Sequence, residues 1–358
     1  MNIVFRVDAT YDLGIGHVMR CLTLAQHLTQ HISSLNISFV CSEELPNSMH
    51  GKIVEKGYAL HLIGLSNVGQ HSDAEQFLKV IEPMEVDWVI TDHYSLDITW
   101  ETLVRPFTRG IIIIDDLANR RHDCDVIIDQ NLYANLEKRY RSLIPEHCIP
   151  MLGPNYSLIR EEFFEVADQI QERDECKNIL VSFGGSDPTD ELGKVLSALE
   201  KDVLQLKKFN FHVVAGPANP RQSQLQELCK NIPNVCFYPQ VNQMAKFLLN
   251  MDLAIGAGGI SLWERCFMGV PSIVIIVADN QEEAVLEAAK KGLAWNLGFS
   301  SKVSSSDITE VLIRVALTPE ELKVKSSQAI AFMSNLKTRR AHPITSIIER
   351  YSSDGSYK

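Results

Sequence analysis

The residues best suited to chemistry come directly after the first predicted strand. Residues 2–8 are apolar enough to form a buried strand, and apolar residues after His17 recur at the spacing of a helix. Gly14 and Gly16, in the segment DLGIGHVMRC, therefore lie at a strand-to-helix turn, where glycines can adopt positive φ and let backbone N–H groups approach an anion. A phosphorylated ligand bound there would lie beside His17, and a histidine can act as a base at neutral pH.

Two other interpretations of this turn exist. In the first, Gly14 and Gly16 only make a tight turn and His17 caps the helix; the local sequence does not decide this point. The second is a dinucleotide site, but the pattern G-x-G-x-x-G requires glycine at position 19, where the chain has Met19. The sequence therefore disfavours a nicotinamide cofactor.

A second glycine turn lies in the C-terminal half, in the segment GAGGISLWE that ends at Glu264. It follows a predicted strand and opens a predicted helix, so its backbone N–H groups can form an anion pocket. Glu264, one turn inside the helix, is placed to accept hydrogen bonds from vicinal ribose hydroxyls. This combination is typical of nucleotide-sugar binding. The pocket residues are Gly258, Gly259, Ile260 and Ser261.

A third glycine turn, SFGGSDP at residues 182–188, also follows a strand and precedes a predicted helix. Ser186 or Asp187 is predicted to cap that helix, with Pro188 near its first position. For this turn and the second one, the plainer explanation is a crossover at which glycine supplies positive φ.

The order of predicted elements indicates an α/β fold. Apolar strand-like runs alternate with amphipathic stretches, which predicts βαβ units and parallel sheets. The alternation stops in a connecting region, roughly 131–177, where a charged helix is expected at 160–173, and then restarts. The 358 residues therefore predict two doubly wound, Rossmann-like domains, at 1–150 and 151–340. A tail, 341–358, is expected either to pack back or to be disordered.

Composition narrows the partners. The net charge of −11 opposes binding to nucleic acid or to an anionic membrane surface. The eight cysteines form no C-x-x-C pair and have no zinc spacing, which is typical of reduced core thiols in a cytoplasmic protein. No apolar stretch reaches the roughly 18 residues of a membrane span. We expect a cytoplasmic protein with no membrane insertion and no obligatory protein partner.

Two groups of motifs resemble known families. The second glycine turn, with Gly269-Val270-Pro271 and Asn280-Gln281 after it, resembles the nucleotide-binding half of GT-B glycosyltransferases, among them the lipid II N-acetylglucosaminyltransferase. The motifs of the first half, with SFGGSDP, are similar to the UDP-2,4-diacetamido-2,4,6-trideoxy-β-L-altropyranose hydrolases of pseudaminic acid biosynthesis. These motifs are Asp8, GIGHVMRCLTLA, Asp92-His93-Tyr94, Asp115-Asp116-Leu117 through Asp129-Gln130-Asn131, and Leu152-Gly153-Pro154 with Tyr156, Leu158 and Arg160.

This resemblance implies a GT-B-like fold whose two domains face a central cleft, and hydrolysis of a UDP-linked diacetamido-trideoxy sugar to UDP and free sugar. The family's catalytic histidine falls on His17, which would activate water at the anomeric carbon. UDP is a good leaving group, so one base and N–H donors can suffice. The expected substrate-binding residues are Gly14, Gly16, Tyr94, Arg160, Gly258, Gly259, Ile260, Ser261, Glu264 and Asn280.

No metal and no cofactor are expected. Asp123-Cys124-Asp125 has the D-x-D form of a metal site, but carboxylates beside a strand more often cap turns. Tyr94 has an alternative role in packing, and Arg160 an alternative place on a solvated helix face.

Two alternative functions remain open at this point. One is a GT-B glycosyltransferase in which His17 deprotonates an acceptor hydroxyl, because fold does not separate transfer from hydrolysis. The first domain shows no basic amphipathic stretch for a lipid-linked acceptor, which favours water. The other is a non-catalytic nucleotide-sugar binding protein, against which His17 argues.

Overall fold

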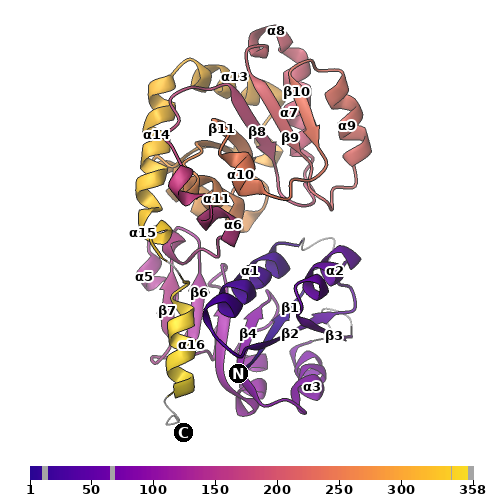
Figure 1. Cartoon of the computed structure of the whole chain (residues 1–358), viewed down its shortest axis with the longest axis vertical. Coiled ribbons are helices and arrows are strands. Elements are labelled where there is room, and N and C mark those ends of the chain that lie inside the picture. The colour runs from indigo at the N-terminus through magenta and orange to yellow at the C-terminus, as the bar shows by residue number, and fades with distance from the viewer. Residues whose placement is uncertain (10–14, 65–68, 340, 354–358) are drawn as a thin grey trace. The chain divides into compact units, whose positions relative to one another are not determined.

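A computed structural model describes residues 1–9, 15–64, 69–339 and 341–353 (Figure 1). The chain forms two compact units, each built around its own parallel sheet. Unit 1 contains residues 1–131 and 135–158 together with the C-terminal segment from Arg339, and unit 2 contains 132–134 and 159–338. The units divide at Leu158/Ile159 rather than at the predicted residue 150.

Unit 1 has a seven-stranded parallel sheet in the order β3-β2-β1-β4-β5-β6-β7. The order reverses between β1 and β4, and ligands of doubly wound sheets bind at the carboxyl ends of the strands at such a point. The strands are β1 (Asn2–Val7), β2 (Asn36–Ser42), β3 (Ala59–Ile63), β4 (Val86–Asp92), β5 (Thr108–Ile114), β6 (Val126–Asp129) and β7 (Ile149–Leu152).

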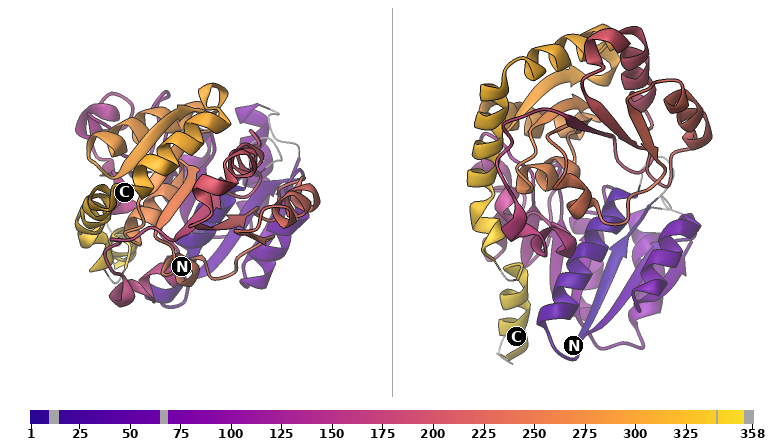
Figure 2. Two further views of the ribbon diagram at one scale, coloured as in Figure 1. Left: turned by 90° about the horizontal axis from the view of Figure 1, so that it is seen from above. Right: turned by 45° about the horizontal axis from the view of Figure 1, so that its top comes forward.

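Helices cover both faces of this sheet (Figure 2), which explains why its strands are apolar along their length. Ile3 and Phe5 of β1 pack in the cluster that contains α1, α2 and α16, whereas Val4 packs in the cluster of α3 and α4. The helices are α1 (Gly16–His31), α2 (Asn47–Glu55), α3 (Gln70–Ile81), α4 (Ile98–Val104), the short α5 (Leu136–Arg139) and α16 (Ile344–Ser353).

Unit 2 has a six-stranded parallel sheet in the order β10-β9-β8-β11-β12-β13, which reverses between β8 and β11. Both glycine turns of the C-terminal half follow these two strands. The strands are β8 (Asn178–Ser182), β9 (Asn210–Val214), β10 (Val235–Tyr238), β11 (Leu253–Ala257), β12 (Ser272–Ile276) and β13 (Ala294–Phe299). The helices are α6 (Glu161–Phe164), α7 (Glu191–Lys201), α8 (Val203–Leu206), α9 (Gln222–Lys230), α10 (Met244–Leu248), α11 (Ile260–Phe267), α12 (Glu282–Lys290), α13 (Ser305–Ala316), α14 (Pro319–Phe332) and α15 (Ser334–Lys337).

The structure differs from the sequence-based expectation at three elements. The predicted charged helix at 160–173 is wrong, because only α6 and a 3-10 turn, Ala167–Gln169, form there. Strand β7 is unexpected because it contains Pro150, which an edge strand tolerates. Strand β13, the other unexpected strand, contains Gly298 at φ 100° and shifts register against β12.

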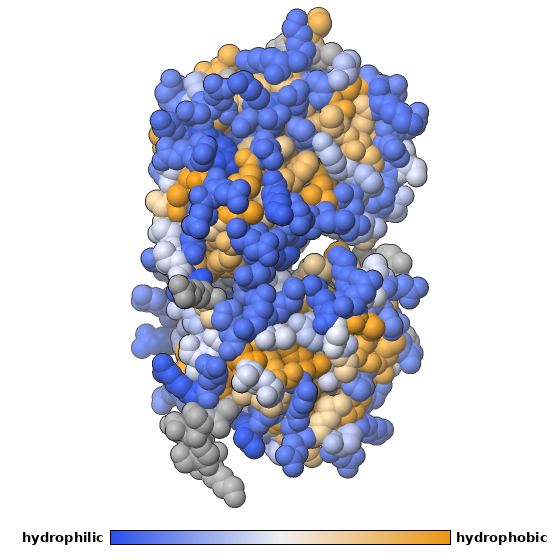
Figure 3. All heavy atoms as spheres, in the orientation of Figure 1, coloured by the Kyte–Doolittle hydropathy of each residue, from blue (hydrophilic) through white to orange (hydrophobic). Residues whose placement is uncertain are grey.

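The surfaces that face the viewer are largely hydrophilic, with scattered apolar patches (Figure 3). None of the helices in the described part of the chain combines the length and the hydropathy of a membrane span. The eight cysteines all lie in the described part of the chain as free thiols, and six of them are buried.

The C-terminal segment belongs to unit 1. Helix α16 packs on α1 through Ile344 and Ile348, so this part of the tail packs back, which was one of the two expectations. The buried side chain of His342 fixes its start: Nε2–H donates to the carbonyl of Tyr156 at 3.1 Å, and Nδ1 accepts from the N–H of Ile344 at 3.3 Å. The second bond needs the neutral imidazole, because a protonated Nδ1 cannot accept, whereas Nε2–H donates in either form.

This arrangement predicts acid sensitivity of the C-terminal segment. Burial lowers the pKa of His342 to about 4. Because this value is below the ordinary pKa of about 6.5, the stabilisation is complete above pH 6.5 and declines as the pH falls toward 4, by up to about 3 kcal/mol. Hydrogen exchange of the α16 amides, corrected for intrinsic rates, should show this loss in the wild type. His342→Gln, which keeps a donor and an acceptor, should remove most of the dependence; an unchanged dependence would contradict the assignment.

Candidate active site

His17 and Asp92 meet at the point where the strand order of unit 1 reverses. His17 lies in the first turn of α1, directly after β1, and Asp92 is the last residue of the neighbouring β4. Nδ1 of His17 lies 2.6 Å from Oδ1 of Asp92. Because a carboxylate only accepts, Nδ1 carries the proton and Nε2 keeps its lone pair. This is the arrangement of a histidine base whose tautomer is fixed by an acid.

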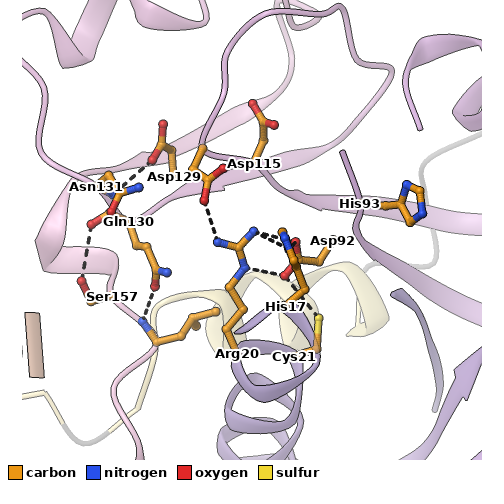
Figure 4. Close-up of polar contacts among 12 residues, drawn as sticks. His17, Arg20, Cys21, Asp92, His93, Asp115, Asp129, Gln130, Asn131 and Ser157 are labelled. Carbon is orange, nitrogen blue, oxygen red and sulfur yellow. Dashed lines mark hydrogen bonds and ion pairs between the residues drawn. The ribbon is translucent and has the colours of Figure 1, made fainter. Parts of the chain in front are cut away.

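Arg20, one turn after His17 on α1, holds the same carboxylate (Figure 4). Its Nε donates to Oδ2 of Asp92 and its Nη2 to Oδ1 at 2.6 Å, while its Nη1 donates to Asp116 at 2.9 Å. The thiol of Cys21 also points at Asp92, with its Sγ 3.7 Å from Oδ2. All these side chains are buried.

The electrostatics keep Asp92 ionised. Burial alone would raise the pKa of Asp92, but the charges and hydrogen bonds of Arg20 and His17 outweigh it and hold the pKa well below its ordinary range. The pKa of Arg20 lies well above its ordinary value because Asp92 and Asp116 outweigh the cost of its burial. Asp92 therefore stays a carboxylate acceptor for the imidazole.

Tyr94 lies against the imidazole. Its ring meets that of His17 edge to face, with the centroids 4.5 Å apart. Burial, together with the negative charge of Asp116, raises the pKa of Tyr94 well above its ordinary value, so the phenol is neutral. The structure thus brings together two of the residues predicted for this site, His17 and Tyr94.

The glycine turn before α1 needs two corrections. The N-cap of α1 is Ile15 and no side chain caps the helix, so the alternative in which His17 is a capping residue is wrong. Gly16 begins the helix without a positive φ, and the expected left-handed conformation is therefore absent there. Gly14 lies outside the described residues.

A second buried network supports the ends of β1 and β4. Arg6 pairs with Asp8 at 2.6 Å and with Asp73 at 2.5 Å, and Nε2 of His93 donates to Asp8 at 3.0 Å. Asp8 also accepts from the N–H of Ser42 at the end of β2, at 2.7 Å. In Figure 4, His93 lies apart from His17. This network joins neighbouring strands rather than adding a second base.

The remaining acidic motifs of unit 1 are paired with arginines. Asp123 and Asp125 both pair with Arg105, at 3.1 Å and 2.5 Å. Asp115 pairs with Arg120 at 2.8 Å and accepts from the N–H of Ala118. In the part of the chain that the structure describes, no group of three or more His, Cys, Asp or Glu side chains is arranged to hold a metal ion.

In unit 2 the turn after β11 is built by close packing. A Cβ on Gly258 would lie 2.2 Å from Cγ2 of Val285 on α12. Gly259 is the N-cap of α11 at φ −75°. Neither glycine has a positive φ, so conformational freedom does not explain them. The first N–H groups of α11, at Ile260 and Ser261, have no partner within the helix and can bind an anion.

Arg265 lies behind this turn. Its guanidinium, almost wholly buried, donates to the carbonyl of Ala257 at 2.7 Å, to Oγ of Ser261 at 3.1 Å and to Oγ of Ser272 at 2.9 Å. Burial lowers the pKa of Arg265 to about 10, so it stays charged at neutral pH. These bonds go to neutral oxygens, and the charge therefore adds to the positive potential at the start of α11.

Glu264 is paired with Arg160. The guanidinium donates from Nε to Oε1 of Glu264 at 2.7 Å and from Nη2 to Oε2 at 3.0 Å. Arg160 is the N-cap residue of α6, and its Nη1 also lies 2.7 Å from Oε1 of Glu162. The structure thus joins two residues that were each predicted to bind substrate, and Arg160 is not on the predicted solvated helix face.

The other predicted contacts of unit 2 are placed differently from the expectation. Asn280 lies in a 3-10 turn, Asp279–Gln281, but it is Gln281 that accepts from the N–H of Gly258, at 3.2 Å. Helix α7 begins at Glu191, later than predicted, although Asp187 does accept from its first two N–H groups. Gly184 has the expected positive φ of 84°.

Sequence reasoning missed the residues that position the base and the turn. Arg20 was available as a signal, because it lies one turn after His17 and so shares its helix face. Asp92 was noted only as part of the motif Asp92-His93-Tyr94. Gln281 belongs to the Asn280-Gln281 motif, but no local pattern showed that it would accept from the N–H of Gly258, a contact between distant parts of the chain.

Comparison with known proteins agrees with this architecture. Residues 179–340 match the family model described as the glycosyltransferase family 28 C-terminal domain. The structure of Acinetobacter baumannii MurG superposes with a TM-score of 0.66 at 14% identity, covering 98% of this chain and 99% of that one. The chain has the GT-B fold.

Two curated relatives extend over most of this GT-B chain. A protein of Campylobacter jejuni named UDP-2,4-diacetamido-2,4,6-trideoxy-β-L-altropyranose hydrolase is 25% identical over 82% of this chain and 97% of its own length. An uncharacterized protein of Methanocaldococcus jannaschii is 29% identical over 81% of this chain. The match spans only 59% of the length of that archaeal relative.

The close packing at the second glycine turn yields a paired prediction. Gly258→Ala should cost about 1–3 kcal/mol of unfolding free energy, because Val285 must move. Gly259→Ala, whose new Cβ would have its nearest neighbour at 3.9 Å, should cost at most about 1 kcal/mol. Urea unfolding of both variants measures the difference. Adding Val285→Ala should relieve the first variant, and equal losses in the two glycine variants would contradict the packing explanation.

Proposed function

We propose that this protein hydrolyses a UDP-linked diacetamido-trideoxy sugar, of the 2,4-diacetamido-2,4,6-trideoxy-β-L-altropyranose type, to UDP and the free sugar. The observation that carries the proposal is the buried pair of His17 and Asp92, at the point where the strand order of unit 1 reverses. The name of the Campylobacter relative, a protein matched over 97% of its own length, supports the same reaction. A relative from Helicobacter pylori is named as both this hydrolase and a pseudaminic acid cytidylyltransferase, which supports a place in pseudaminic acid biosynthesis. Unit 2, with its family 28 domain, supports a nucleotide-sugar donor.

In the proposed reaction, Nε2 of His17 takes a proton from water as the water oxygen bonds to the anomeric carbon. The bond from that carbon to the diphosphate oxygen breaks, and UDP leaves with the bonding electrons. Asp92 accepts from Nδ1–H throughout and stabilises the imidazolium that forms. No acid need protonate the leaving group, because a diphosphate is a far weaker base than an alkoxide. A single displacement inverts the anomeric configuration.

The proposed UDP contacts lie in unit 2. Backbone N–H groups of Gly258, Gly259, Ile260 and Ser261 would bind the diphosphate, assisted by the charge behind them, and Glu264 would accept from the ribose hydroxyls. Arg160 and Asn280 complete the proposed binding residues of unit 2, and Tyr94 and the turn at Gly14 and Gly16 those of unit 1.

A glycosyltransferase is the second candidate, and the family 28 match and the MurG-like fold favour it. The same base would then act on an acceptor hydroxyl. Incubation of the pure protein with the UDP-sugar alone separates the two functions, because a hydrolase releases UDP and free sugar in equal amounts without an acceptor. UDP release that requires an acceptor would contradict hydrolysis, and UDP-sugar binding without any release would indicate the non-catalytic alternative.

His17 provides the first test of the mechanism. His17→Asn should lower saturating turnover roughly 100-fold or more while leaving UDP affinity unchanged, because the base is lost and the UDP contacts are in the other unit. His31→Asn, which changes an exposed histidine of the same helix, serves as the control and should keep wild-type turnover. Near-normal turnover of His17→Asn would remove this residue from catalysis.

Glu264 provides the test of UDP binding. Glu264→Ala should weaken UDP by about 1–3 kcal/mol, because the ribose hydroxyls lose a buried acceptor. Calorimetric titration with UDP measures the change, and Glu227→Ala on the exposed side of α9 is the control. UDP affinity that is the same in Glu264→Ala and in the wild type would contradict the ribose assignment.

A further inference from the structure

We propose that Arg160 exchanges between Glu264 and Glu162 and thereby controls access of the ribose to Glu264. This exchange sets how strongly the protein prefers a ribonucleotide to a 2′-deoxyribonucleotide. This inference rests on the proposed function, in which Glu264 binds the ribose of UDP. It assigns a specificity role to Glu162, and it replaces the direct substrate contact proposed above for Arg160 with an action on the ribose through Glu264.

The competition follows from the geometry of the pair. The two bonds from Arg160, at 2.7 Å and 3.0 Å, occupy both oxygens of Glu264, one each. The side chain of Glu264 is only 9% exposed, so little of the carboxylate lies open beyond the edge that the guanidinium covers. Vicinal ribose hydroxyls need the same two oxygens. Ribose binding therefore requires Arg160 to give up at least one of its bonds.

Glu162 can hold the guanidinium of Arg160 after it leaves Glu264. Its Oε1 lies 2.7 Å from Nη1 of Arg160, the nitrogen that Glu264 does not use. Its Oε2 accepts from the N–H of Ala245 at the start of α10, at 3.2 Å, which fixes the carboxylate. The ring of Phe163 lies 5.1 Å beneath the guanidinium carbon. Arg160 can therefore leave Glu264 without losing all of its partners.

Arg160 can exchange partners without losing all of its hydrogen bonds at once, because its side chain is partly exposed to water. Arg160 is 30% exposed at its side chain, so water can replace part of what it loses. Removing Arg160 would leave Glu264 uncovered and strengthen its bonds to ribose. Neutralising Glu162 would weaken the holding position and leave Arg160 on Glu264. The two substitutions therefore act on ribose selection in opposite directions.

The test compares UDP with 2′-deoxy-UDP by calorimetry on the full chain. The ratio of their dissociation constants reports the ribose contact and cancels most effects on the diphosphate. In Arg160→Met this ratio should rise roughly two- to tenfold over the wild type, the contribution of one hydrogen bond. In Glu162→Gln, which still accepts from Ala245, it should fall. The double variant should match Arg160→Met, because Glu162 acts only through Arg160.

Any other outcome contradicts the proposed role of Arg160. A ratio that falls or stays unchanged in Arg160→Met, with UDP still bound, would show that Arg160 orients or ignores Glu264, and would leave the proposed function intact. A ratio near one in the wild type and in Arg160→Met would show that Glu264 does not bind the ribose. Failure of the wild type to bind UDP at all would contradict the proposed function itself. Glu162→Gln, a near-isosteric change, decides the sign if the methionine variant does not fold.

Discussion

The carboxylate of Asp92 is the interaction on which the site of unit 1 depends. It lies where the strand order reverses, at the end of β4 and beside the start of α1. It accepts from three side chains of α1: His17, Arg20 and Cys21. Burying a charge is costly unless it is paired, and here Arg20 supplies the pairing that lets Asp92 remain ionised next to His17. Without that arginine the acid would tend to take up a proton and release the imidazole.

The same requirement explains the arginines along this edge of the sheet. Asp8, Asp92 and Asp116 each pair with an arginine inside unit 1. A cluster of unpaired acids would attract protons and would repel a diphosphate, and pairing with arginine offsets part of that negative charge. The hydrogen bond to Asp92 therefore selects the tautomer of His17.

Much of the fold could be predicted from sequence because buried parallel strands give long apolar runs with few alternatives. The strands on either side of the two reversals in strand order, β1 and β4 in unit 1 and β8 and β11 in unit 2, were predicted in this way. Strands β7 and β13 were not predicted, because Pro150 and Gly298 interrupt their strand-like patterns. The site was harder. His17 and Glu264 carry local signals, a glycine turn and a helix start, but their partners come from other elements, and no periodicity shows that Asp92 or Arg160 will reach them. The glycine turns show the same limit: Gly258 is required by Val285, a residue on a different helix.

Buried arginines have different electrostatic roles in the two units. In unit 1, Arg20 pairs with two carboxylates, so its own charge is fully compensated and one net negative charge remains beside the base. In unit 2, Arg265 donates to neutral oxygens of β11, α11 and β12, so its charge is uncompensated by any ion pair in the described part of the chain and acts on the start of α11. A helix N-terminus attracts anions weakly once solvated, and a buried cation behind it strengthens that attraction without competing for the ligand. Arg160, by contrast, covers the two carboxylate oxygens that a ribose would use, and a cation in that position selects among ligands instead of merely attracting them.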